Sequence, residues 1–261
     1  TYDVYDGEVV RIQAGAHTFT QTEDHQLYAV QTSPADRTKY RSWDKAFQNI
    51  HYDPCWVNAN ELKPGDFLLV KKPQKRSATL DRVIIDIKKT RWRQYIDRTL
   101  EIPLNEEFGE LIGLYLAEGY ARSGGQMGLC YSGDEEMLHK KSAYLIKKYF
   151  QIESRLEKHS KSNSAQVVFN EICIAAFLRN KLGCSCYKKH IPEEWMKKAP
   201  LEFMRGILWG YLHGDGTVSQ PRTMGYSTTS CLLAMQIQQV AMELGIFFGV
   251  TTKDGSTEEQ P

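Results

Sequence analysis

One sequence pattern occurs twice in this chain, at positions separated by 97 residues (206 minus 109). The first copy reads GELIGLYLAEG (109–119) and the second reads GILWGYLHGDG (206–216). Both copies are apolar segments typical of a helix, and both end on an acidic residue followed by glycine. The downstream segments MGLCYSG (127–133) and MGYSTTS (224–230) begin at the same separation, and an amphipathic segment follows each of them. A whole supersecondary unit has therefore been duplicated.

Small residues recur at every fourth position in both predicted helices. A glycine inside a helix costs about 1 kcal/mol relative to alanine, so these glycines need a structural reason. Residues four apart share one helix face, and small residues on one face let two backbones approach closely. We therefore expect the helices to pack closer than the usual distance of about 8–10 Å between axes. The predicted interface consists of Gly109, Gly113, Ala117, Gly206, Gly210 and Gly214.

Each predicted helix carries a carboxylate in its last turn and a glycine after it. Glu118 and Asp215 occupy the matching acidic positions, and Gly119 and Gly216 are expected to end the helices as left-handed caps. A carboxylate at the C-terminal end interacts unfavourably with the helix dipole, which costs about 0.3–1 kcal/mol. Close packing of the helices also brings the two carboxylates near enough to repel each other. A divalent cation removes both penalties. We predict that Glu118 and Asp215 bind Mg²⁺, or Mn²⁺ in its place, and catalyse phosphodiester hydrolysis. The alternative is a symmetric helix pair whose acids face water.

The two repeated segments resemble the signature helices of LAGLIDADG homing endonucleases, from about residue 100 to residue 261. The resemblance implies an α+β fold of two αββαββα repeats related by a pseudo-twofold axis, whose curved antiparallel sheets lie in the major groove of double-stranded DNA. It also implies metal-dependent cleavage of both strands at a long, asymmetric target. The segment KKHIPEEW (188–195) resembles a block of intein-encoded members, in which the active-site lysine falls on Lys189.

The N-terminal part is typical of an all-β domain, because short runs of Val, Ile, Thr and Tyr alternate there with Gly and Asp. Segments 18–28 (TFTQTEDHQLY) and 58–70 (NANELKPGDFLLV) resemble parts of the Hint splicing domain of inteins. In that domain, Thr22 and His25 would help to activate the N-terminal peptide bond. A splicing intein begins with Cys or Ser and ends with Asn, whereas this chain begins with Thr and ends with Pro. We therefore expect the chain as given not to splice.

The second repeat is shorter than the first. Residues 247–255 (FFGVTTKDG) match the third strand of the unit, and no sequence remains for a last strand, a last helix or a second lysine. Either the chain is a fragment that a complementing C-terminal polypeptide completes, or sequence has been lost. The expected organisation is a partial Hint domain (1–75), a basic linker or DNA-contact segment (76–101), a first repeat (102–199) and an incomplete second repeat (200–261).

The overall charge does not identify a partner, because 33 Lys and Arg balance 32 Asp and Glu. Basic residues nevertheless concentrate in segment 71–98, where they are interleaved with aromatic residues, which suits a phosphate backbone. Charged residues also alternate along segment 153–161, and Gln and Asn of the next strand have side chains that read adenine. The alternatives are a solvated linker and a solvated sheet face. The DNA-binding candidates are Lys88, Lys89, Arg91, Arg93, Arg155, His159, Lys161, Gln166 and Asn170.

The sequence also argues against several protein classes. It lacks the run of about 20 apolar residues that a membrane span needs, so no membrane partner is expected. Its six cysteines include no C-x-x-C pair, which favours reduced thiols in the cytoplasm, with access to the nucleus if the source is eukaryotic. The leading hypothesis is a site-specific double-strand DNA endonuclease of intein homing. The alternatives are a non-cleaving nucleic-acid-binding protein and an intein whose full-length parent mainly splices.

Overall fold

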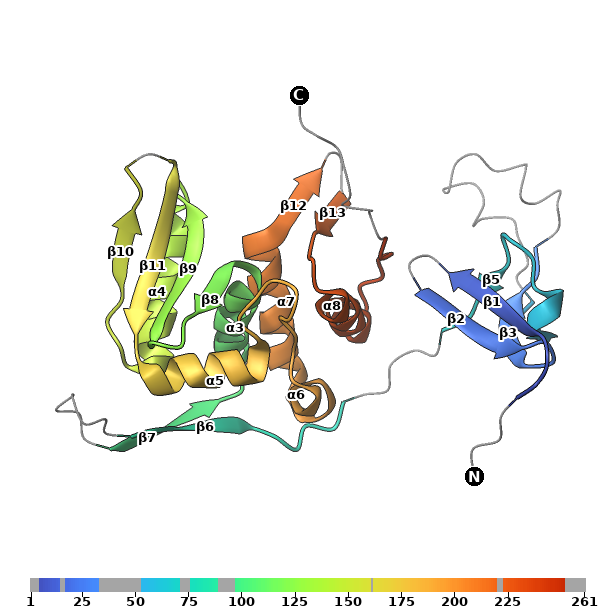
Figure 1. Ribbon diagram of the computed structural model, residues 1–261, viewed down its shortest axis with the longest axis horizontal. Helices are drawn as coiled ribbons and strands as arrows, with labels where there is room; N and C mark the ends of the chain where they lie inside the picture. The colour runs from blue at the N-terminus through green and yellow to red at the C-terminus, as the bar shows by residue number, and fades with distance from the viewer. Residues whose placement is uncertain are drawn as a thin grey trace. The chain divides into compact units, whose positions relative to one another are not determined.

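The computed structural model describes residues 5–14, 17–32, 53–70, 76–88, 97–160, 162–219 and 223–251 (Figure 1). The chain divides into two compact units, the first formed mainly by Thr1–Lys72 and the second spanning Pro73–Phe248. Within the described residues, no helix has the length and apolar character needed to cross a membrane.

The described part of the first unit consists of short antiparallel strands and one 3-10 turn. Strands β1 and β2 form a hairpin, and β3 lies between β4 and β5 in a second sheet. The all-β prediction is confirmed for these residues, whereas the Hint identity stays a prediction. The elements are β1 (Val9–Ala14), β2 (His17–Thr22), β3 (Gln26–Val30), β4 (Cys55–Asn58), the 3-10 turn (Ala59–Glu61) and β5 (Phe67–Leu68).

The second unit contains the predicted αββαββα order in full between residues 106 and 182. Asn105 caps the N-terminus of its first helix, because the Asn105 side chain accepts a hydrogen bond of 2.9 Å from the Phe108 N–H. The four strands form one antiparallel sheet in the order β10-β11-β9-β8. The elements are α3 (Glu106–Glu118), β8 (Gly119–Ala121), β9 (Gln126–Ser132), α4 (Glu136–Phe150), β10 (Arg155–Lys158), β11 (Ser164–Asn170) and α5 (Ile172–Leu182).

The second repeat begins in the same way and then differs from the prediction. Helix α7 (Leu201–Asp215), the hairpin of β12 (Gly216–Ser219) and β13 (Thr223–Tyr226), and helix α8 (Cys231–Glu243) follow one another. The strand expected over 247–255 is wrong for its described part, residues 247–251. The Phe248 carbonyl accepts a bond of 2.9 Å from the Gln238 side chain of α8 instead of a bond from a strand neighbour.

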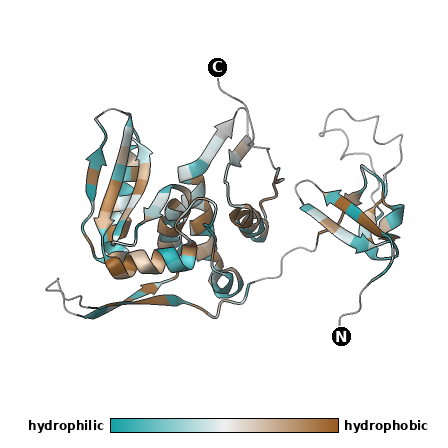
Figure 2. Cartoon of the chain, in the orientation of Figure 1, coloured by the Kyte–Doolittle hydropathy of each residue, from teal (hydrophilic) through white to brown (hydrophobic). Residues whose placement is uncertain are grey.

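The segment expected as a basic linker or DNA-contact segment forms a β-hairpin of the second unit in its described part. Strands β6 (Arg82–Ile87) and β7 (Arg98–Pro103) pair along their whole length. The hairpin belongs to the core because four of its side chains are buried there, namely Ile85, Ile87, Leu100 and Ile102. The short helix α6 (Glu193–Lys198) precedes α7. Hydrophobic residues concentrate along α3, α7 and α8, where the core of the unit lies (Figure 2).

A nearly buried ion pair ties the start of the second unit to α8. The Arg76 guanidinium contacts Glu243 Oε2 at 2.6 Å and donates to the Trp195 carbonyl at 2.9 Å, and only 5% of the arginine side chain is exposed.

Removing one partner of a buried pair costs about 3–5 kcal/mol. Arg76→Ala should therefore lower the free energy of unfolding by about 3 kcal/mol in urea denaturation. Arg82→Ala, which removes a solvent-exposed ion pair with Glu101, should leave the unfolding midpoint nearly unchanged. Equal midpoint shifts in the two variants would contradict this account.

Candidate active site

Helices α3 and α7 lie side by side with their backbones in contact (Figure 1). A Cβ added at Gly109 would lie 2.1 Å from the Phe203 carbonyl oxygen, and one at Gly113 would lie 2.2 Å from that of Ile207. On the opposite helix, a Cβ at Gly206 or Gly210 would meet carbonyl oxygens of α3 at 2.0 and 2.1 Å. The six small residues singled out in the sequence therefore lie on one interface, which extends to Gly214 against the Ala117 methyl group. No side chain fits between the helices there, so their C-terminal ends meet.

The glycines that follow the helices differ from the prediction. Gly119 has φ −83° and ψ 150°, and Gly216 has φ −77° and ψ 141°, so neither is left-handed. The prediction of left-handed caps is wrong because each helix continues directly into a strand, β8 or β12. The need for glycine is steric instead, because an added Cβ would lie 2.5 Å from the Tyr115 carbonyl oxygen or 2.0 Å from that of Leu212.

Glu118 and Asp215 are half-buried at the meeting ends of the two helices. Burial, with the neighbouring Asp215, raises the pKa of Glu118 to about 7, although Lys189 acts in the opposite direction. Burial also raises the pKa of Asp215, and the Tyr211 hydroxyl and Lys189 partly offset that rise. Each carboxyl group is thus harder to ionise than an ordinary acidic side chain. This is expected for two acids that lie close together and away from solvent.

Lys189 completes the group and is only 6% exposed. Its ammonium group donates a hydrogen bond of 3.0 Å to the Ala117 carbonyl, in the last turn of α3, and lies 5.6 Å from the centre of the Tyr115 ring. Burial lowers the pKa of Lys189, while Asp215 and Glu118 partly restore it. The structure therefore brings together the three residues that the sequence predicted as catalytic.

The raised pKa of the acid pair has a consequence for stability. The pKa of Glu118 is about 7 in the folded chain against an ordinary value of 4.5, so the folded state holds protons that the unfolded state releases between these values. Stability must fall as the pH rises through that window. We expect the free energy of unfolding of the wild-type chain, without divalent metal, to decrease from pH 5 to pH 8 relative to the variant Glu118→Gln/Asp215→Asn. Lys189 is present in both proteins, so urea denaturation at each pH isolates the acids. Parallel curves would contradict the assigned pKa.

The pair of acids fits a magnesium-like ion by its chemistry. Both donors are hard carboxylate oxygens, and the cost of placing them together is one that a cation removes. Among the described residues, no group of three or more His, Cys, Asp or Glu side chains is arranged to hold a metal. Mg²⁺ does not need such a group, because it keeps several waters and uses one or two carboxylates together with substrate phosphates. Glu118 and Asp215 are the residues that would hold it.

The outer face of the four-stranded sheet carries several DNA-binding candidates. In the strand register, Gln166 lies opposite Cys130 on one side and Glu157 on the other, and Asn170 lies opposite Gln126. The alternate residues of β11, such as Val167 and Phe169, are buried in the core. Arg155 and His159 lie with Gln166 on the outer face, because Arg155 pairs with Glu157 at 2.5 Å and the His159 ring lies 3.4 Å from the Gln166 amide.

The remaining candidates lie elsewhere or are not described. Lys88 follows β6 and belongs to the hairpin instead of the four-stranded sheet. Thr22 and His25 belong to the N-terminal unit, where the His25 N–H donates to the Thr22 carbonyl at 3.1 Å across a turn. Four candidates lie outside the described residues: Lys89, Arg91, Arg93 and Lys161.

Sequence reasoning missed the tyrosines around the acids. The Tyr115 hydroxyl donates to the Gly183 carbonyl at 2.9 Å, and Tyr211 lies close enough to Asp215 to lower its pKa. Tyr120 follows Glu118 and Gly119 directly and lies on the outer sheet face. Its position next to the acidic motif was the available signal, but an aromatic residue after a helix is more often part of a core.

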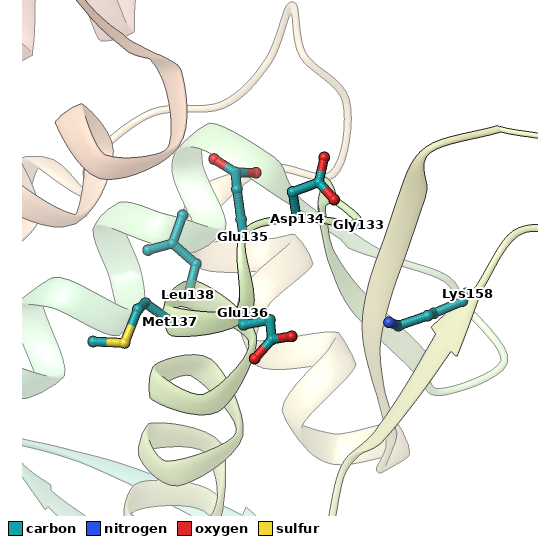
Figure 3. Close-up of a pocket in the computed structure, with 7 residues that line it drawn as sticks. All are labelled: Gly133, Asp134, Glu135, Glu136, Met137, Leu138 and Lys158. Atoms are coloured by element: carbon teal, nitrogen blue, oxygen red, sulfur yellow. The ribbon is translucent and has the colours of Figure 1, made fainter.

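A separate open pocket of about 500 Å³ lies between the β9–α4 turn and β10 (Figure 3). Asp134, Glu135 and Glu136 come from the turn and the start of α4, and the Lys158 side chain extends from β10. The Glu135 carboxylate accepts a hydrogen bond from the Ser132 N–H at 2.7 Å, and its charge contributes to the raised pKa of Glu118. The pocket contains none of the predicted catalytic residues.

Comparison with known proteins gives similarities over much of the chain. An ATP-dependent DNA helicase Hel308 from Thermococcus kodakarensis is 30% identical over 74% of this chain and 19% of its own length. An uncharacterized protein from Methanocaldococcus jannaschii is 23% identical over 92% of this chain and 32% of its own. An iron-sulfur cluster assembly SufBD family protein from Mycobacterium tuberculosis is 25% identical over 92% of this chain and 27% of its own. The chain thus spans about a fifth to a third of these relatives.

A solved structure and a family model are also similar to parts of this chain. The crystal structure of I-DmoI in complex with DNA and Mn superposes with a TM-score of 0.44 and 12% identity, over 58% of this chain and 85% of that one. The family model described as a LAGLIDADG-like domain matches residues 202–260, which include Asp215. The C-terminal part of this chain is therefore similar to a LAGLIDADG-like domain.

Proposed function

We propose that this chain is a site-specific double-strand DNA endonuclease that depends on a divalent metal and acts in intein homing. The observation that carries the proposal is the acid pair Glu118 and Asp215, brought together at the ends of two closely packed helices with Lys189 beside it. The duplication of the helix, the glycine face and the terminal acid supports the same view, because a symmetric pair of acids suits two strands of one duplex.

The residues of the site have separate parts in the proposed reaction. Glu118 and Asp215 would hold Mg²⁺ or Mn²⁺, which, when bound, stabilises the attacking and leaving oxygens of phosphodiester hydrolysis. Lys189 is nearly buried and close to the acids, so its ammonium group would stabilise negative charge on the scissile phosphate and orient the attacking water. Its hydrogen bond to the Ala117 carbonyl holds the side chain at the end of α3.

DNA binding is proposed for the outer face of the sheet β10-β11-β9-β8. That face offers arginine, histidine, glutamine and asparagine side chains, which contact phosphates and base edges. The sheet is antiparallel and packs one face on the core, and on its other face Gln166 and Asn170 are partly exposed while Val168 is buried. The partly exposed side chains are the ones proposed to face a groove.

The intein context is supported by the relatives. A helicase and an iron-sulfur cluster assembly protein have unrelated names, yet 74% and 92% of this chain match segments within them. A segment shared by otherwise different proteins is what an inserted element produces. We propose that the N-terminal unit, with Thr22 and His25, derives from a splicing domain. In the described residues the second repeat has two strands where the first has four.

The test uses the host gene sequence without the insertion, cloned in a supercoiled plasmid. Ca²⁺ coordinates oxygen more loosely than Mg²⁺, so binding is measured in Ca²⁺ by gel shift and cutting is measured in Mg²⁺. We expect binding in Ca²⁺ and a linear product in Mg²⁺. If the chain binds the DNA in both ions but produces no linear product, the chain is a non-cleaving DNA-binding protein and the proposed endonuclease function is wrong.

A further inference from the structure

The Tyr120 side chain crosses one strand of the sheet to reach the next. Tyr120 lies opposite Gly128 in the pairing of β8 with β9, and Gly128 lies opposite Val168 in the pairing of β9 with β11. The Tyr120 hydroxyl nevertheless donates a hydrogen bond of 3.1 Å to Gln166 Oε1 on β11. The tyrosine therefore spans the width of β9 on the outer face.

Gly128 makes this crossing possible. A Cβ at position 128 would lie 2.7 Å from Cε1 and 2.8 Å from the hydroxyl of Tyr120, so the ring occupies the space that any other side chain would fill. In the hairpin of β12 and β13, the position that corresponds to Gly128 is also a glycine, Gly225, and it lies opposite Thr217. Thr217 is too short to cross its neighbour, and its hydroxyl donates instead to the Gly225 carbonyl at 3.4 Å. The long side chain is thus particular to the first repeat.

Gln166 is held at both ends of its amide group. Its oxygen accepts from Tyr120, and its nitrogen lies 3.4 Å from His159 Nε2, just beyond β10. The amide is therefore oriented with its oxygen toward β8 and its nitrogen toward β10. An amide oxygen has two lone pairs and the nitrogen has two hydrogens, so each atom retains one free position after these contacts.

We propose that Gln166 is a base-reading residue for adenine and that Tyr120 and His159 are positioning residues that fix the direction in which it reads. This inference rests on the proposed function. Adenine presents an N6 donor and an N7 acceptor in the major groove, which match the oxygen and the nitrogen of a glutamine amide. Because the amide is fixed, the adenine must lie with its N6 amino group toward β8 and its N7 atom toward β10.

The neighbouring charges favour this assignment. The Arg122 guanidinium lies over the Tyr120 ring, 5.4 Å from its centre. Arg155, the other cation close to this position, is engaged by Glu157 at 2.5 Å. The neutral, oriented amide therefore lies on a sheet face that also carries arginine side chains, a residue type that contacts phosphates while amides read base edges.

The experiment selects sequences from a double-stranded DNA library with a randomised segment, bound by the full chain in Ca²⁺. The wild-type chain should enrich a sequence with adenine at one Gln166-dependent position. Gln166→Ala should lower the adenine preference there by about tenfold, and Gln166→Arg should change it to guanine. Tyr120→Phe should weaken the preference at that position while overall affinity stays nearly unchanged, which a merely structural role would not produce. The matched control is Gln126→Ala, on the same face, which should leave that position unaltered.

Two outcomes would overturn the inference, and only one of them would also overturn the proposed function. If the wild-type chain enriches a sequence but Gln166→Ala and Gln166→Arg alter no position in it, the base-reading role is wrong and the proposed function stands. If the wild-type chain enriches no sequence at all, the proposed function fails, and the role of Gln166 fails with it.

Discussion

Gly210→Ala is expected to lower the free energy of unfolding by at least about 3 kcal/mol, because it adds a methyl group where two backbones touch. The new Cβ would lie 2.1 Å from the Glu110 carbonyl oxygen and 3.0 Å from its Cα. Backbone atoms of a packed helix cannot move aside as a flexible side chain does, so α3 and α7 must separate along their whole contact. Separation also moves Glu118 away from Asp215. The measurement is urea denaturation followed by circular dichroism.

Gly124→Ala is the matched control for this substitution. Gly124 lies in the turn between β8 and β9, has nothing within 4 Å of an added Cβ, and does not have a positive φ. The same change of one methyl group should therefore leave stability unchanged or raise it slightly, because alanine restricts the unfolded chain. Equal stability of the two variants would show that the helices are not in backbone contact.

Glu118→Gln and Asp215→Asn are each expected to reduce DNA cleavage in Mg²⁺ by at least about 10²–10³-fold. An amide has nearly the shape of the acid but does not offer a charged oxygen to the cation, so the fold is kept and the metal is lost. Binding to the same DNA in Ca²⁺ should persist. Cleavage is measured as the rate at which supercoiled plasmid becomes linear, with both variants compared at equal protein concentration.

The control for the acids is Glu202→Gln, which neutralises an exposed carboxylate in the first turn of the same helix as Asp215. It changes the net charge by the same amount at the opposite end of α7, so its cleavage rate should stay close to that of the wild-type chain. A comparable loss in all three variants would mean that general charge, and not the acid pair, sets the rate.

The close packing of α3 and α7 was predictable from the sequence because the information there is local and repeated. The spacing of glycine every four residues defines one helix face, and its repetition 97 residues later identifies the partner face. Once the helices pair, the acids at their ends have only one place to meet. The start of α3 was predictable for the same reason, since Asn105 and two glutamates mark a helix start within a few residues.

Other features depend on contacts that no short sequence pattern encodes. Segment 76–101 is basic and was interpreted as a linker or a DNA-contact segment. In the structure, four apolar residues on one face of the hairpin of β6 and β7 join the core of the second unit. Gly119 and Gly216 were expected as left-handed caps because glycine after a helix usually is one. Here the steric limit comes from the preceding helical turn. The crossing of Tyr120 over Gly128 requires the register of three strands, which the sequence does not supply.

The most direct test of the central claim is cleavage of the uninterrupted host sequence in Mg²⁺ by the wild-type chain and by the variant Glu118→Gln/Asp215→Asn, in parallel. The acid pair at the ends of α3 and α7 predicts a linear product from the wild-type chain, with both strands cut at one site, and intact supercoiled plasmid from the variant. Cleavage at the same rate by both proteins would contradict the account.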